Sequence, residues 1–125
     1  MDRPAEPVAA PQKNLTEALD RLWARFLPEI RERVAVLESA ASSAAQGALT
    51  DAEREAAHAA AHKLAGVLGT FGLTRGTELA RELEIAFSGD ACLNLGAAKN
   101  LIQAVAELRA VIESRQDGPS LIPGP

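Results

Sequence analysis

The sequence has few of the residues that characterise several common protein classes. Its 125 residues include one cysteine, Cys92, and no tyrosine, and aromatic residues make up only 3% of the chain. A single cysteine excludes an internal disulfide and fits a reducing compartment. Because aromatic residues are so few, we expect a core built from Leu, Val, Ile and Ala.

Basic residues are also too few for a protein that binds nucleic acid. The formal net charge is -4 at pH 7, whereas a phosphate backbone needs a basic surface. No apolar run is long enough to span a bilayer, and no secretory signal is recognisable at the N-terminus. The sequence therefore predicts a cytoplasmic protein that binds neither nucleic acid nor membrane, and we expect it to be a monomer.

Hydrophobic residues make up 47% of the chain and are spaced as helices require. From residue 15 they recur at steps of three and four, at Leu15, Leu19, Leu22, Phe26, Ile30, Val34, Leu37 and Ala41. Pro28 lies within this run and removes one backbone hydrogen bond. We therefore expect the first helix to be kinked or broken at Pro28.

Three further helices follow. Thr50 and Glu53 form a capping box that begins the second helix, and Gly72 is suited to end it. Thr74 is a suitable N-cap for a third helix that ends near Ser88, and a fourth helix begins near Asn94. Four amphipathic helices with short connections pack most simply as an antiparallel four-helix bundle, so the fold class is all-α.

The ends of the chain differ in composition from this bundle, which we place over residues 14–116. Residues 1–13 contain three prolines among Ala and Glu, and residues 117–125 read DGPSLIPGP. Such segments bury little apolar surface. We expect a disordered leader at the start and a disordered tail or linker at the end.

The second helix has an unusual outward face over residues 57–72, AHAAAHKLAGVLGTFG. At 3.6 residues per turn, one face carries the residues expected to be buried, namely Ala57, Ala60, Ala61, Leu64, Leu68 and Phe71. The opposite face carries His58, His62, Ala65, Gly66 and Gly69. Long polar side chains normally cover a solvated helix face, and an interior Gly costs about 1 kcal/mol relative to Ala. This bare face predicts that a large partner approaches His62 closely.

The segment from His62 to Gly72 resembles the signature of histidine-containing phosphotransfer (HPt) domains. The resemblance rests on His62-Lys63-Leu64-Ala65-Gly66 followed by Gly69, Phe71 and Gly72. It implies that His62, and not His58, accepts the phosphoryl group. This sequence departs from the family pattern at two positions. It has Ala65 where Lys is common and Val67 where Ser is common.

The resemblance also implies what each side of the reaction supplies. A receiver domain of a response regulator or hybrid histidine kinase would donate the phosphoryl group from an aspartate and would hold the Mg²⁺. This chain would have no cofactor of its own and would be a phosphocarrier rather than an enzyme. From the bare face itself we expect a docking surface of His58, Lys63, Ala65, Gly66 and Gly69 around the phosphohistidine, and we hypothesise that Lys63 offsets the phosphoryl charge.

Two other functions remain open from the residues alone. The same bundle could dock a receiver or another copy of itself without phosphorylation. Alternatively, His58 and His62 have the i, i+4 spacing with which two imidazoles share a metal ion, although no third ligand is apparent in the sequence.

Overall fold

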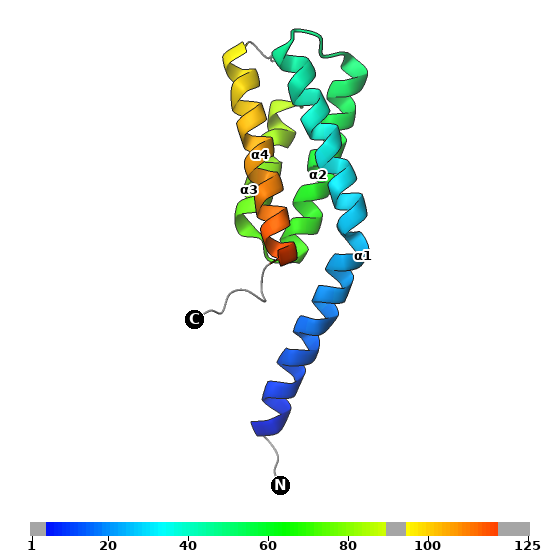
Figure 1. Cartoon of the computed structure of the whole chain (residues 1–125), viewed down its shortest axis with the longest axis vertical. Helices are drawn as coiled ribbons and strands as arrows, with labels where there is room; N and C mark the ends of the chain where they lie inside the picture. Colours follow the sequence, from blue (N-terminus) through cyan, green and yellow to red (C-terminus); the bar gives the residue numbers. More distant parts are fainter. Residues whose placement is uncertain (1–4, 90–94, 118–125) are drawn as a thin grey trace.

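The computed structural model describes the backbone of residues 5–89 and 95–117 and the side chains of residues 14–89 and 98–115. It contains four helices, which are α1 (Ala5–Ala45), α2 (Asp51–Thr70), α3 (Thr74–Ala86) and α4 (Leu95–Asp117). Successive helices run in opposite directions (Figure 1). The described residues include no strand. The prediction of an all-α antiparallel four-helix bundle is confirmed.

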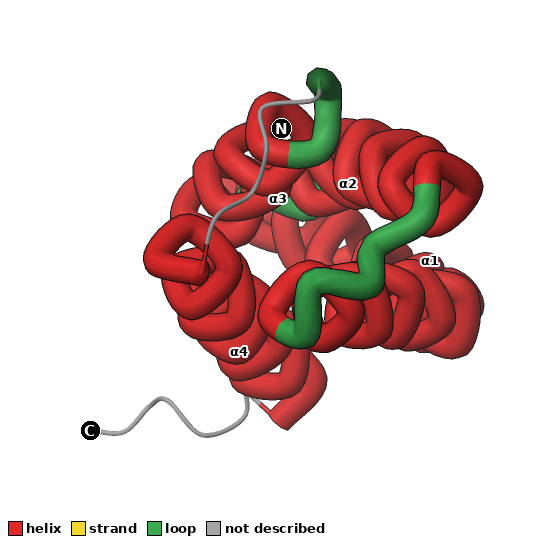
Figure 2. The backbone as a smooth tube through the Cα atoms, turned by 90° about the horizontal axis from the view of Figure 1, so that it is seen from above, coloured by secondary structure: helices red, strands yellow, loops and turns green. Residues whose placement is uncertain are grey.

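The four helices form a closed ring in which each helix packs against two others. α1 contacts α2 and α4, and α3 contacts α2 and α4. Figure 2, which views the bundle from above, shows the helices around a common centre. Within the described part of the chain, the neighbours of α2 are α1 and α3, while α4 lies diagonally across the bundle from it.

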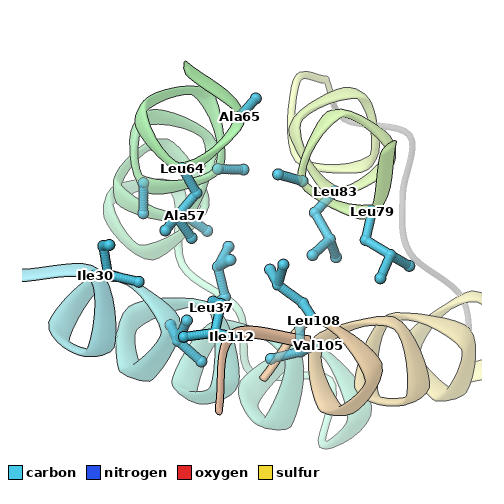
Figure 3. Close-up of a cluster of buried hydrophobic side chains, with 14 of the residues drawn as sticks. Ile30, Leu37, Ala57, Leu64, Ala65, Leu79, Leu83, Val105, Leu108 and Ile112 are labelled. Atoms are coloured by element: carbon cyan, nitrogen blue, oxygen red, sulfur yellow. The ribbon is translucent and has the colours of Figure 1, made fainter. Parts of the chain in front are cut away.

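The core between the helices is almost entirely aliphatic. Figure 3 shows buried side chains from all four helices directed toward one another. The largest fully buried side chains include Ile30, Leu37, Leu64, Leu83 and Leu108. Among the described residues no polar or charged side chain is buried. The folding free energy of this bundle therefore comes mainly from the burial of aliphatic surface.

α1 is longer than predicted at its N-terminus. It begins at Ala5, so the prediction of a disordered leader is wrong for residues 5–13. Pro7 lies in the first turn, where a backbone N–H has no intrahelical acceptor, and it does not prevent a helix from starting there. The helix also continues through Pro28 without a break. Figure 1 shows α1 bent rather than straight, in agreement with a kinked rather than a broken helix.

The first half of α1 does not bury the side chains that the apolar spacing predicts. Leu15 is 60% exposed, and Leu22 and Phe26 are 36% and 39% exposed, whereas Trp23 and Leu27 are buried. Figure 1 shows the reason for the exposure of Leu15, because α1 extends past the ends of the other three helices and has no neighbouring helix there against which to pack. Leu22 and Phe26 are exposed for another reason, since the adjacent residues Trp23 and Leu27 form the buried face of α1 at that level.

The start of α2 forms as the sequence predicts. The Thr50 hydroxyl accepts a hydrogen bond from the Glu53 N–H at 3.1 Å, and the Glu53 carboxylate accepts one from the Thr50 N–H at 3.0 Å. This reciprocal capping box satisfies two backbone donors that the helix itself leaves unpaired.

A three-residue turn joins α2 to α3. Gly72 has a φ of +74°, and its N–H donates to the Gly69 carbonyl, while the Leu73 N–H donates to the Leu68 carbonyl. These are the two bonds of a Schellman motif, which requires a left-handed residue at this position. Gly72 therefore ends α2 as predicted. The prediction that Thr74 caps α3 is wrong, because Leu73 is the N-cap and no side chain caps that end.

Several predictions fall outside the described residues. They concern Cys92, Asn94 and the tail at residues 118–125. The described part of α4 begins at Leu95, next to the predicted start of the fourth helix. In the part of the chain that the structure describes, no helix has both the length and the apolar character needed to cross a membrane.

Candidate functional site

His62 projects from the exposed side of α2. Its side chain is 71% exposed, while Ala61 and Leu64 on either side are completely buried. The same helix therefore fixes the backbone of His62 through its buried face and leaves the imidazole accessible to a partner.

A carboxylate from α3 holds one nitrogen of this imidazole. His62 Nδ1 lies 2.8 Å from Glu84 Oε2, a normal hydrogen-bond distance. A carboxylate can only accept a hydrogen bond, so Nδ1 must carry the hydrogen. In the neutral ring this leaves the lone pair on Nε2, which is the nitrogen free to react.

His58 lies one turn before His62 and faces the same carboxylate. Its Nε2 is 3.9 Å from Glu84 Oε2, which is too long for a hydrogen bond. The His58 side chain is less exposed than that of His62, at 40% against 71%. The structure therefore brings both histidines to Glu84 but gives only His62 a direct bond.

The glycines of the outward face leave open space beside the imidazole. A Cβ atom built on Gly66 would meet no other atom within 4 Å, and one on Gly69 would meet only the Thr77 hydroxyl at 3.8 Å. Both residues are exposed. The fold itself does not require glycine at position 66, so the space above it is available to an approaching molecule.

Ala65 differs from the prediction. Its side chain is only 5% exposed and belongs to the hydrophobic core, so the prediction that Ala65 lies on the outward docking face is wrong. α2 packs between α1 and α3, and its buried arc is therefore wider than a single stripe. A helical projection of α2 alone cannot show which flank its neighbour covers.

Lys63 lies next to His62 and is exposed. Among the described residues its ammonium group has neither a hydrogen bond nor an ion pair. It is therefore available to an anionic group bound at the imidazole.

Glu84 is a site residue that the sequence analysis does not predict. One signal in the sequence could have found it. Gly72 fixes where α2 ends and α3 starts, and an antiparallel pair with so short a turn places residues at similar distances from Gly72 opposite each other. Counting from Gly72 in both directions places Glu84 near His62.

The described residues contain no group of three or more His, Cys, Asp or Glu side chains arranged to hold a metal ion. The two imidazoles instead face a carboxylate that one of them uses as a hydrogen-bond acceptor. No observation at this site therefore favours the metal-binding alternative.

Comparison with known proteins gives one match. A family model described as "Hpt domain" matches residues 21–118, which is more than half of the chain and includes both His62 and Glu84. No curated protein and no solved structure matches.

Proposed function

Since this chain belongs to the Hpt domain family, whose members are phosphocarriers of two-component phosphorelays, we propose that His62 is its phosphoryl-accepting residue. In this proposal a receiver-domain aspartate donates the phosphoryl group to His62, and His62 passes it to an aspartate of another receiver.

The observation that carries the proposal is the orientation of the His62 ring. Glu84 occupies Nδ1 at 2.8 Å, and the side chain is 71% exposed. The only free nitrogen, Nε2, therefore belongs to an accessible side chain. A nucleophile that must attack phosphorus in line with the leaving oxygen needs both properties.

The chemical step follows from this arrangement. The Nε2 lone pair attacks the phosphorus of the aspartyl phosphate, the N–P bond forms, and the P–O bond to the aspartate breaks. The aspartate leaves as a carboxylate with the electron pair of that bond. The ring gains positive charge while Nδ1 keeps its hydrogen, and the Glu84 carboxylate stabilises that charge. The reverse reaction with another receiver restores the neutral imidazole.

In this proposal the receiver supplies the other groups that the transfer needs. The receiver holds Mg²⁺ and the carboxylates that position it, and both proteins act in the cytoplasm. His58, Lys63, Gly66 and Gly69 surround His62 and form the surface on which the receiver docks. The open space above Gly66 supports this assignment because no side chain of this chain fills it.

Radiolabelled phosphorylated receiver domains provide the test. Mixing them with this protein should transfer label to it, and the bound label should be labile in acid and stable in alkali, as expected of phosphohistidine. His62→Gln should abolish the label, while the matched variant His58→Gln should retain it. Label that persists in His62→Gln contradicts the assignment of His62. Receiver binding that is undiminished in His62→Ala, with no transfer to the wild type, would instead identify a non-catalytic docking module.

A further inference from the structure

Arg81 is an arginine of α3 without a partner in this structure. It is exposed, and within the described part of the chain its guanidinium makes no hydrogen bond or ion pair. Most other described arginines bind a carboxylate, as do Arg31, Arg33, Arg75, Arg109 and Arg115. The unpaired guanidinium of Arg81 is therefore available to an external anion.

The packing of α2 against α3 places Arg81 beside the histidine site. Gly69 lies opposite Thr77, because a Cβ on this glycine would sit 3.8 Å from the threonine hydroxyl, and His62 lies opposite Glu84. Arg81 is four residues after Thr77 and three before Glu84, so it shares their face of α3. It therefore lies along the α2–α3 groove, one helical turn from Glu84.

The α2 residues opposite Arg81 are small. The α2 residue opposite Arg81 is Ala65, whose small side chain is buried, and the next residue is Gly66, which has open space above it. Three residues of helix rise about 4.5 Å along the axis. The flexible side chain of Arg81 spans that distance.

Phosphorylation of His62 would create a need for positive charge at this place. A phosphoryl group carries about 1.5 to 2 negative charges at pH 7, and the Glu84 carboxylate already lies at the other ring nitrogen. The protein as a whole has a net charge of -4. Arginine is suited to the task because its planar guanidinium can donate two parallel hydrogen bonds to a phosphoryl group.

We infer that Arg81 binds the phosphoryl group carried by His62 Nε2 and thereby sets the lifetime of the phosphohistidine. This inference rests on the proposed function of His62. Lys63 contributes a point charge from α2, whereas Arg81 contributes a directional pair of hydrogen bonds from α3. The groups that face the phosphoryl group are then Glu84, His58, Lys63 and Arg81.

The full chain can be tested without a receiver, by phosphorylating it with phosphoramidate and following the phosphohistidine by ³¹P NMR as a function of pH. Arg81→Gln should raise the midpoint of the phosphoryl ionisation by about half a pH unit, the shift expected for one unit charge about 5 Å away in water. Because the protonated phosphoryl group hydrolyses faster, the phosphohistidine of Arg81→Gln should have a lifetime about threefold shorter at neutral pH. Arg81→Lys should restore part of both changes.

Lys99→Gln is the matched control, since Lys99 is an exposed cation of α4, which is not a neighbour of α2 in the bundle. In Lys99→Gln the midpoint of the phosphoryl ionisation and the phosphohistidine lifetime should equal those of the wild type. The inference is overturned if Arg81→Gln also matches the wild type while His62 becomes phosphorylated in both, and the proposed function then stands. If the wild type takes no phosphoryl group, or if His62→Gln is labelled equally, the proposed function fails and the inference fails with it.

Discussion

The Glu84 carboxylate should act on His62 in two separable ways, and two substitutions distinguish them. Glu84→Gln keeps an oxygen that accepts the Nδ1–H bond, so the ring keeps its tautomer, but it removes the negative charge. Two unit charges about 4 Å apart interact by about 1 kcal/mol in water and more strongly where water is excluded. Because the His62 side chain is 71% exposed, we take the value for water, which corresponds to a transfer rate about fivefold slower.

Glu84→Ala removes the hydrogen bond as well as the charge. A lost hydrogen bond of this kind costs about 1 kcal/mol more, so the total should be about a thirtyfold slower transfer. The assay is the single-turnover rate of phosphoryl transfer from a saturating phosphorylated receiver, measured with rapid quenching. Glu82→Gln removes the same charge from an exposed position of α3 and should leave the rate unchanged.

Two results would refute this reasoning. If Glu84→Gln transfers as fast as the wild type, the carboxylate charge does not stabilise the ring during transfer. If Glu84→Gln and Glu84→Ala are equally slow, the hydrogen bond to Nδ1 contributes nothing beyond the charge. The thermal midpoint of each variant must stay near that of the wild type, which is the expected result because Glu84 is not part of the buried core.

Other predictions concern stability and can be checked by urea and thermal denaturation. Gly66→Ala should stabilise the protein by about 1 kcal/mol because the added methyl meets only open space, yet it should slow transfer from a receiver. Gly72→Ala should destabilise it by about 1 kcal/mol, because its φ is +74°. Leu64→Ala should cost about 2 to 5 kcal/mol, since this side chain is completely buried. The pKa of Glu113 lies below its usual value because Arg31 donates two hydrogen bonds to its carboxylate. That stabilisation is complete above the unfolded-state pKa of about 4.3 and disappears as the pH falls through the folded-state pKa, so Arg31→Gln should weaken the loss of stability in acid.

The elements that follow from local sequence were predictable. The capping box of Thr50 and Glu53 involves residues three positions apart, and the buried face of α2 follows from helical periodicity. The outward direction of His62 could be predicted for the same reason, because it is opposite to buried Leu64 and Leu68 on the helical projection.

The features that helical periodicity alone does not give depend on how one helix lies against another, and the pairing of His62 with Glu84 needs the short turn at Gly72 as a second signal. The bond between His62 and Glu84 joins residues 22 positions apart, and the burial of Ala65 depends on which flank of α2 is covered by α3. The exposure of Leu15 has a related cause. Apolar spacing shows which face of α1 is hydrophobic, but it does not show where the neighbouring helices end.

The short connection between α2 and α3 has a consequence for how this protein can vary. Gly72 fixes a turn of three residues, so the imidazole and the carboxylate are presented by a single helical hairpin, while α1 and α4 supply the rest of the buried core. Substitutions on the solvent faces of α1 and α4 can accumulate without altering the separation of these two groups. The chemistry of the site and most of the molecular surface are therefore free to evolve independently.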